Sequence, residues 1–173
     1  MERRLVSPEA FVVAPHDLLA NRWMLLTAGD FSARQFNSMT IAWGGFGTIW
    51  YKPFAQVVVR PTRYTREFME KYDTFTLCAF PPQCKPALQL IGSKSGRDGN
   101  KIAEAGLTPV ASSKAGAPVF AEADLVIECR KIYWQDFDPS HFLDPAIEGF
   151  YPQKDYHRIY YGEILAIGQA AQG

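Results

Sequence analysis

The sequence has few residues of the kinds that build metal sites or disulfide frameworks. Its three cysteines, Cys78, Cys84 and Cys129, are odd in number and form no CxxC pair, which argues against both a disulfide framework and a zinc cluster. We expect them to be buried thiols. The three histidines are far apart and share no spacing typical of metal ligands, and we therefore predict no metal.

The chain also lacks net charge and long apolar runs. Eighteen basic residues balance eighteen acidic ones, so no overall field attracts nucleic acid or an anionic membrane, and any anion site must be a local arrangement. No stretch approaches about twenty apolar residues, and residues 1–13 contain no apolar run typical of a signal peptide. We predict a cytoplasmic protein with a small-molecule partner, bound to neither nucleic acid nor membrane.

The 173 residues, 47% of them apolar, are enough for one domain spanning 1–173 with a substantial core. No repeat, low-complexity tract or Gly/Ser linker divides it. Apolar and β-branched runs predict strands over 21–28, 39–44, 54–61, 73–80, 123–134 and 156–167. Short helices are predicted over 65–72, 85–91 and 100–106, the last two stopped by Gly92 and Gly106. Because strands and helices do not alternate, we predict a mainly β fold, a single barrel with short peripheral helices.

The first stretch that could carry chemistry is FNSMTIAWGGFGTIWYKP, residues 36–53. It places Asn37, Ser38 and Thr40 ahead of Trp43 and a run of glycines. Polar groups followed by an aromatic ring and by residues without side chains suit a flat, partly apolar ligand that also needs hydrogen bonds. The same stretch equally suits a surface hairpin around a core tryptophan, because glycine permits unusual backbone geometry.

A second stretch, VVVRPTRYTREFME, runs from a β-branched strand into Arg60, Arg63 and Thr65 at the expected start of a helix. Thr65 can cap that helix, whose free N–H groups and positive dipole end attract a phosphate. The planar guanidinium of Arg63 can hold the phosphate oxygens. A capped surface helix with solvated arginines is the alternative interpretation.

A third stretch, IGSKSGRDGNK, is a polar loop that could close on the same anion from the other side, with Ser93, Lys94, Ser95, Arg97 and Lys101. A solvated loop is the alternative. The stretch lacks the Gly-Lys-Ser/Thr order of a phosphate-binding loop, which disfavours a nucleoside triphosphatase. GGFGTIW likewise lacks the third glycine and the following helix of a Rossmann dinucleotide site.

The fourth stretch, DYHRIYYGEI, places His157 among tyrosines on an expected strand. This histidine is either a structural group or a ligand contact. No serine, histidine and acid grouping indicates a hydrolase, and no carboxylate pair indicates glycoside chemistry.

Together, four motifs resemble the flavin reductase-like family, and the flavoredoxin branch is the most similar. The resemblance extends from about residue 20 to residue 167 and is specific because the motifs occur in the family's order and spacing. The motifs are Asn37-Ser38-Met39-Thr40 with Trp43, then Arg60-Pro61-Thr62-Arg63-Tyr64-Thr65, then Ser95-Gly96-Arg97-Asp98 with Lys101, and finally Asp155-Tyr156-His157 with Gly162-Glu163-Ile164.

The resemblance implies an FMN-binding split barrel, an antiparallel Greek-key β-barrel that forms a homodimer and holds FMN without covalent attachment near the subunit interface. It implies that the loop along the flavin ring is formed by Asn37, Ser38, Met39, Thr40 and Trp43. Ring-edge or phosphate contacts are then expected from Arg60, Arg63, Thr65, Ser95, Arg97 and Lys101. Gly44 and Gly45 would let the backbone approach the ring, and His157 would approach the flavin or a nicotinamide.

The function implied is an FMN-dependent oxidoreductase that takes hydride from NADH or NADPH and passes electrons to a redox partner protein or a free acceptor. The chemistry would belong to the cofactor, so no protein nucleophile is needed. A non-enzymatic FMN electron carrier and a flavin-free dimeric binding module are the alternatives. The insert over 135–154 differs most between branches of the family, and it leaves the substrate open.

Overall fold

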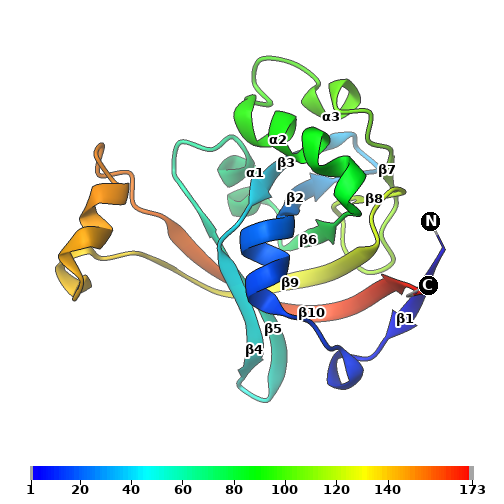
Figure 1. Ribbon diagram of the computed structural model, residues 1–173, viewed down its shortest axis with the longest axis horizontal. Helices are drawn as coiled ribbons and strands as arrows, with labels where there is room; N and C mark the ends of the chain where they lie inside the picture. Colours follow the sequence, from blue (N-terminus) through cyan, green and yellow to red (C-terminus); the bar gives the residue numbers. More distant parts are fainter. Residues whose placement is uncertain (1, 172–173) are drawn as a thin grey trace.

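A computed structural model describes residues 2–171 and shows a mainly antiparallel β fold (Figure 1). The eight-stranded sheet follows the order β3 (Gln35–Ile41), β2 (Met24–Asp30), β6 (Thr74–Ala79), β9 (Leu125–Asp136), β10 (Arg158–Ala170), β5 (Lys52–Val59) and β4 (Gly44–Ile49), with β1 (Arg3–Val6) also paired to β10. Every pairing in this sheet is antiparallel. Strands β7 (Pro109–Val110) and β8 (Val119–Phe120) form a separate ribbon. The predicted mainly β class is confirmed.

Strand β10 joins two parts of the sheet. Its first residues pair with β5 and its last four with β1, while β9 follows its other edge. A register shift beside Gly162 lets β10 change direction between these neighbours. Glycine is needed there because a Cβ at Gly162 would lie 2.4 Å from the ring of Phe75.

The core has two parts on opposite faces of β2. Leu26 packs in a cluster with residues of β5, β6 and β9, whereas Leu25 packs in a second cluster with Leu88 and Ile91 of α2 (Lys85–Ser93). Because both faces of β2 are covered, its sequence is a continuous apolar run rather than an alternating one.

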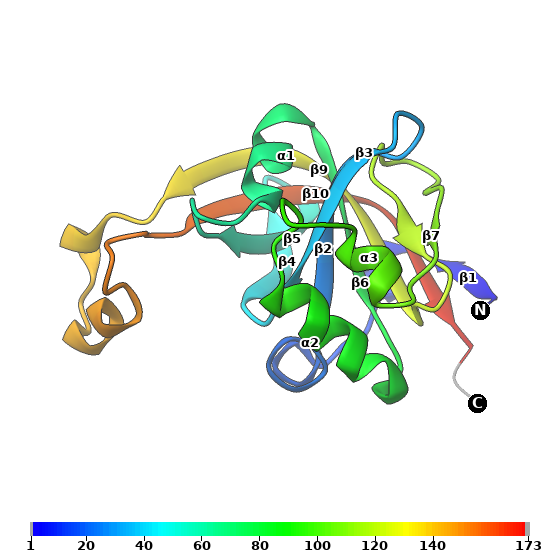
Figure 2. The same cartoon turned by 90° about the horizontal axis from the view of Figure 1, so that it is seen from above.

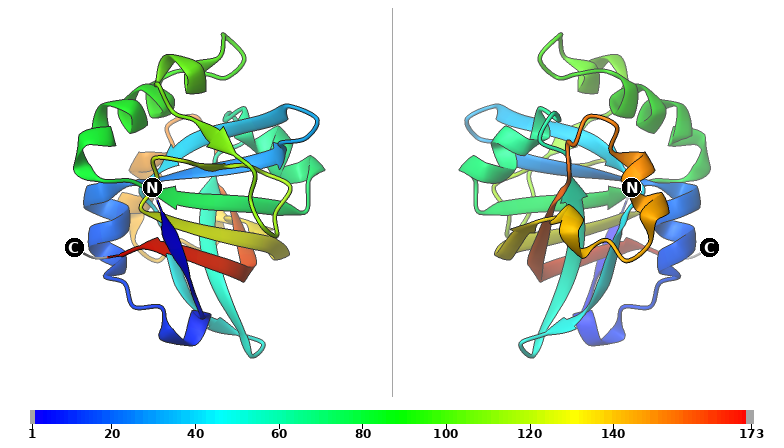
Figure 3. Two further views of the ribbon diagram at one scale, coloured as in Figure 1. Left: turned by 90° about the vertical axis from the view of Figure 1, so that its right-hand side faces the viewer. Right: turned by 90° about the vertical axis from the view of Figure 1, so that its left-hand side faces the viewer.

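Short helices flank the strands. Helix α1 (Thr65–Lys71) and helix α2 both contact β3, and Figure 2 shows them on either side of β2 and β3. Figure 3 shows the π-helical segment η2 (Asp17–Arg22), α2 and the short α3 (Lys101–Glu104) along one flank of the sheet. Single-turn helices occur at η1 (Pro8–Ala10) and η3 (Pro82–Cys84).

Residues 137–157 form an arm that projects from the ends of β9 and β10, drawn in orange in Figure 1. The arm contains two short 3-10 helices, η4 (Pro139–His141) and η5 (Pro145–Phe150). Aromatic contacts hold it together: Tyr151 packs against both Phe142 and Tyr156. The predicted insert is therefore an ordered, aromatic substructure.

Several predicted boundaries were wrong. Strand β3 starts at Gln35 instead of residue 39, and the glycine run forms strand β4, which the sequence did not predict. Gly92 does not stop α2, which continues to Ser93. A Cβ at Gly92 would lie 3.2 Å from Cβ of Thr40, so the glycine allows α2 to pack closely on β3. Gly106, at φ +68°, does follow α3 as predicted.

Among residues 2–171, no helix is long and apolar enough to cross a membrane. Cys78 and Cys129 are buried and Cys84 is half-buried, and all three are free thiols. The predicted burial of the thiols is thus confirmed for the first two and only partial for Cys84.

Candidate functional site

Two adjoining cavities lie along β3, where it meets α1, α2 and the start of β10. The Trp43 cavity has a volume of about 230 Å³ and is lined by Met39, Thr40, Ile41, Ala42, Trp43, Val58, Arg60, Arg63 and His157. The Lys101 cavity, of about 120 Å³, lies beside α1 and the loop after α2, and its polar lining includes Asn37, Arg63, Thr65, Ser93, Lys94, Ser95 and Lys101. Met39, Thr40 and Arg63 line both cavities, which therefore form one elongated site.

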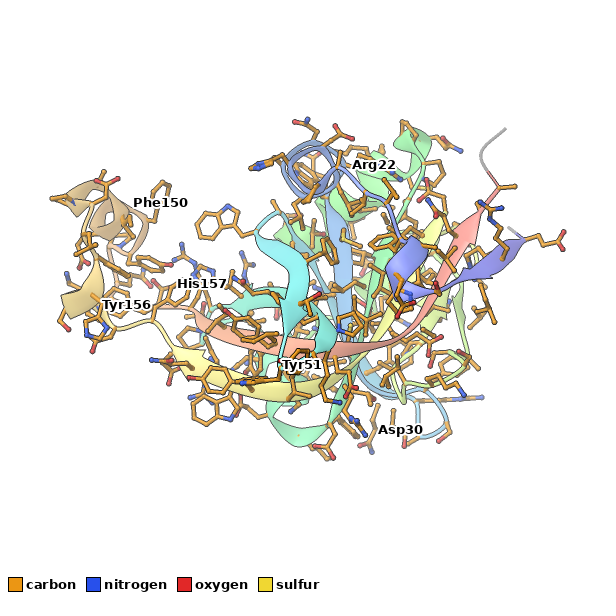
Figure 4. All side chains as sticks on the ribbon, turned by 90° about the horizontal axis from the view of Figure 1, so that it is seen from below. Arg22, Asp30, Tyr51, Phe150, Tyr156 and His157 are labelled. Atoms are coloured by element: carbon orange, nitrogen blue, oxygen red, sulfur yellow. The ribbon has the colours of Figure 1, made fainter. Side chains whose placement is uncertain are left out.

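The Trp43 cavity has an aromatic wall. Trp43 is 45% exposed, and its ring packs against the imidazole of His157 and edge-on against Phe150, with centroids 5.2 and 5.8 Å apart. On the other side, the hydroxyl of Thr40 donates a hydrogen bond to the carbonyl of Leu88 at 2.5 Å and retains its capacity to accept one. This cavity offers a flat apolar surface with polar groups at its edge. Figure 4 shows Phe150, Tyr156 and His157 together on the side of the arm.

His157 is buried and neutral. Its Nδ1 lies 2.8 Å from the hydroxyl of Tyr151. Burial, followed by the positive charge of Arg60, lowers its pKa to about 4. Among the described residues, no hydrogen bond engages Nε2, so this nitrogen is available to a ligand. The sequence pattern predicted that His157 lies on a strand. In the structure His157 immediately precedes β10 instead.

Arg60 holds the arm against the cavity. Its guanidinium donates to both carboxylate oxygens of Asp155, at 2.9 and 3.0 Å, and to the carbonyl of Phe150 at 2.8 Å. These bonds lower the pKa of the Asp155 carboxyl. The guanidinium also lies over the ring of Tyr151, 5.1 Å from its centroid. Arg60 thus lines the cavity as predicted, but its donors are used to position residues 150–157.

The Lys101 cavity gathers positive charge without a lining carboxylate. Arg63 makes one long contact, from Nη1 to the carbonyl of Gly92 at 3.4 Å, and no ion pair with any described residue. Lys101 is only 5% exposed and donates to the carbonyls of Ile91 and Lys94 at 2.9 and 3.0 Å. Burial and then the charge of Arg63 lower its pKa to about 8. Two cations that repel each other across a polar cavity are suited to an anion between them.

Thr65 does not cap α1, contrary to the prediction. The N-cap residue is Tyr64, no side chain caps the helix, and the buried Thr65 hydroxyl instead accepts a hydrogen bond from Nδ2 of Asn37 at 2.8 Å. Thr65 is the first helical residue, so its side chain turns toward β3 rather than back over the helix end. Oδ1 of Asn37 has no hydrogen-bond donor among the described residues. It remains a free acceptor at the site.

The other predicted residues separate into two groups. Met39 and Ser95 line the cavities. Ser38 is fully buried, 2.7 Å from the hydroxyl of Thr27, and lines neither cavity. Arg97 also lies outside both, because its guanidinium pairs with Glu67 at 2.5 Å and covers the ring of Tyr64. The structure therefore gives Ser38 and Arg97 side-chain partners within the protein.

Sequence reasoning missed the arm's contribution and misinterpreted one glycine. Tyr151 and Asp155 position His157 and Arg60, and the only sequence signal was the density of aromatic residues just before His157. At Gly44 a Cβ would lie 2.4 Å from the carbonyl oxygen of Gln56. This glycine therefore permits β4 to pair with β5, and it lines neither cavity.

The site fits a flavin that carries a phosphate. A planar ring system needs an apolar surface with polar groups at its edge, which the Trp43 cavity has, and a phosphate needs unpaired cations, which the Lys101 cavity has. Within residues 2–171, no cluster of three or more His, Cys, Asp or Glu side chains could hold a metal ion.

Comparisons with known proteins agree with this chemistry. The model of the family described as "Flavin reductase like domain" matches residues 17–172. Among curated proteins, no sequence matches the chain.

Solved structures share the fold at low sequence identity. Flavoredoxin of Desulfovibrio vulgaris (Miyazaki F) is 23% identical with a TM-score of 0.64, over 84% of this chain and 67% of the flavoredoxin. Flavoredoxin from Methanosarcina acetivorans is 20% identical with a TM-score of 0.68, over 87% and 69%. The NADH:FAD oxidoreductase SgcE6 of Streptomyces globisporus is 15% identical with a TM-score of 0.63, over 84% and 73%.

Proposed function

The chain belongs to the flavin reductase-like family, and from this premise we propose that it binds FMN and transfers hydride from NADH or NADPH to the flavin, with electrons passing on to an acceptor. The observation that carries the proposal is the elongated site along β3. It has an aromatic wall at one end and, at the other, two cations that form no ion pair with any described residue, in a cavity without a lining carboxylate.

The residues of the site have distinct roles in this proposal. Arg63 and Lys101 bind the phosphate, with the hydroxyl of Ser95 as a further donor, whereas the hydroxyl of Ser93 already donates to the carbonyl of Leu90. Trp43 packs against the isoalloxazine, and the residues of the arm restrict the access of water. When bound, FMN supplies the chemistry, accepting a hydride and releasing electrons singly or in pairs.

His157 acts as a neutral hydrogen-bonding group in the proposal. Its pKa of about 4 leaves the imidazole uncharged at neutral pH. When the Tyr151 hydroxyl donates to Nδ1, the ring proton lies on Nε2, the nitrogen with no other partner. His157 then donates a hydrogen bond to the ligand without adding charge.

A non-enzymatic FMN electron carrier is the second candidate. Trp43 and Phe150 are 45% and 56% exposed, and they place aromatic edges at the mouth of the site. An electron can cross such an edge to a protein partner. Hydride transfer is more demanding, because the reacting atoms must come within about 3 to 3.5 Å of each other.

Spectroscopy and anaerobic kinetics test the proposal. The purified or FMN-reconstituted protein should be yellow, and NADH or NADPH should bleach the bound flavin in stopped-flow experiments without oxygen. If dithionite reduces the flavin at once but neither nucleotide does so within minutes, the carrier replaces the reductase. A protein that stays colourless after incubation with FMN would contradict both candidates and favour the flavin-free binding module.

We further propose a homodimer in the cytoplasm. Trp50, Tyr51 and Trp134 are 57%, 102% and 52% exposed on the β4–β5 hairpin and β9. Exposed aromatic clusters of this kind are typical of interface cores. Sedimentation at micromolar concentration should give twice the chain mass, and a Trp50→Ser, Tyr51→Ser variant should shift it toward the monomer. A wild-type monomer that binds FMN tightly would contradict the dimer.

A further inference from the structure

A cavity larger than either part of the elongated site lies beyond the Lys101 cavity. This Phe68 cavity, of about 770 Å³, is bounded by the β2–β3 turn, α1 and the segment 96–109. Its volume is within the range of small-molecule sites, about 300 to 1,000 Å³. None of the roles proposed above for the flavin ring or its phosphate uses this space.

The Phe68 cavity adjoins the cationic end of the elongated site. Asn37, Tyr64, Gly96 and Lys101 line both it and the Lys101 cavity. The loop at Gly96 approaches β3 so closely that a Cβ there would lie 2.1 Å from Oδ1 of Asn37. At this junction Asn37 has a free acceptor, and the Lys101 ammonium uses only two of its three donors.

The lining of the Phe68 cavity combines aromatic rings with cations. Phe36, Tyr64 and Phe68 contribute ring surfaces, and Tyr64 and Phe68 meet edge-on with centroids 5.1 Å apart. The guanidinium of Arg34 makes no hydrogen bond or ion pair within the described part of the chain. Within residues 2–171, the ammonium of Lys71 contacts the side-chain amide of Gln35 and the ring of Tyr72, and it forms no ion pair. The one lining carboxylate, Glu67, is paired with Arg97.

We propose that the Phe68 cavity binds the adenylate of a dinucleotide, either FAD with its flavin half in the elongated site or NAD(P)H with its nicotinamide against the flavin bound there. A purine ring suits the aromatic surfaces, and the second phosphate suits Arg34 and Lys71. The Trp43 cavity with its aromatic wall comes first, the Lys101 cavity with its two cations follows, and the Phe68 cavity with its rings and cations comes last. FAD contains an isoalloxazine, phosphates and adenosine in that same order. The inference rests on the proposed function, because it takes the flavin ring to lie at Trp43.

Two ligands could supply the adenylate, FAD itself or the NAD(P)H donor. Both carry the same adenosine phosphate, and each has a matched ligand that lacks it: FMN for FAD, and reduced nicotinamide mononucleotide for NADH. Comparing affinities within each pair isolates the contribution of the adenylate.

The test is the double variant Arg34→Gln, Lys71→Gln, which removes two cations of the Phe68 cavity and leaves the elongated site unchanged. The control, Arg4→Gln, Lys114→Gln, removes the same charge at exposed residues that line none of the three cavities. Dissociation constants of FAD, FMN and riboflavin are measured by flavin fluorescence, and those of NADH and reduced nicotinamide mononucleotide by anaerobic reduction rates of the FMN-loaded protein.

The proposal predicts that the double variant weakens FAD about tenfold, as expected for one lost charge-assisted contact, while FMN and riboflavin change less than twofold and the control changes nothing. A loss confined to NADH relative to reduced nicotinamide mononucleotide also supports an adenylate site and assigns it to the donor. Equal losses for FAD, FMN and riboflavin would place the flavin itself in the Phe68 cavity and overturn the proposal. Unchanged affinity for every ligand would overturn it too. Failure of the unaltered protein to bind FMN would instead contradict the proposed function.

Discussion

Arg63 is the residue whose replacement tests the flavin site most directly. It lines both cavities of the elongated site, and within the described part of the chain its guanidinium makes one long hydrogen bond, to the carbonyl of Gly92. The substitution Arg63→Gln therefore removes a cation from the lining of the site while disturbing little else in the protein. If Arg63 binds the phosphate, the variant should lose affinity for FMN but not for riboflavin, which has no phosphate.

The magnitude follows from the contacts available. A hydrogen bond to a charged group contributes about 1.5 to 3 kcal/mol, roughly a ten- to hundredfold change in dissociation constant. The lower end is expected, because Arg63 is exposed and because Lys101 remains to bind the phosphate. Riboflavin affinity should change less than about twofold, within the range of ordinary surface substitutions.

Arg97 provides a matched control in the neighbouring loop. It has the same charge, but its guanidinium pairs with Glu67 and lies outside both cavities of the site. Fluorescence titration of Arg63→Gln and Arg97→Gln with both flavins should show a loss only for the first variant with FMN. Equal losses for the two flavins, or an equal effect at Arg97, would refute the assignment of the phosphate to the Lys101 cavity.

Three further predictions concern pH, the arm and the core. Because Lys101 has a pKa of about 8, FMN affinity should fall between pH 7 and 9 in fluorescence titrations while riboflavin affinity stays constant. The same lowered pKa means that the fold without ligand binds a proton at Lys101 less tightly than the unfolded chain does. The contribution of Lys101 to the free energy of unfolding is therefore present above its ordinary pKa of 10.5 and is lost as pH falls through about 8. Urea titrations above and below this pH range check the sign. Tyr151→Phe removes the bond to Nδ1 of His157 and should lower the free energy of unfolding in urea by about 1 to 3 kcal/mol, weakening FMN and riboflavin equally. Gly162→Ala would place a methyl group 2.4 Å from a phenylalanine ring of β6 and should destabilise the protein by about 1 to 3 kcal/mol in thermal unfolding, whereas Gly45→Ala, whose nearest neighbour would be 3.9 Å away, should not.

The sequence predicted those parts of the fold that depend on local patterns. Continuous β-branched and apolar runs correctly indicated β2, β5, β6 and the two long strands β9 and β10. Strand β4 was missed because three of its six residues are glycine, which has low strand propensity. Its strand conformation depends on pairing with β5, in which Gly44 lies against the backbone of Gln56.

The site was predicted in part, and the failures have a common cause. Asn37 and Ser38 are adjacent in a strand, so their side chains point to opposite faces. Asn37 reaches Thr65 beside the Lys101 cavity, whereas Ser38 pairs with Thr27 on the adjacent strand β2. A short motif identifies which residues are near a ligand, but it does not determine the face on which each side chain lies. That choice depends on contacts with residues far away in the sequence.

The arm explains why the substrate is the least predictable property of this protein. Its inner residues have defined contacts with the site: Asp155 with Arg60, Tyr151 with His157, and Phe150 with Trp43. Its outer side chains have no such constraint, since Leu143 is 96% exposed. In the proposed function, a change on the outer surface can therefore alter which acceptor approaches the ring without disturbing Arg63 and Lys101 at the other end of the site. In the proposed function, binding of the phosphate and choice of the acceptor are thus separated along β3, so the motifs that indicate the phosphate end carry no information about the acceptor.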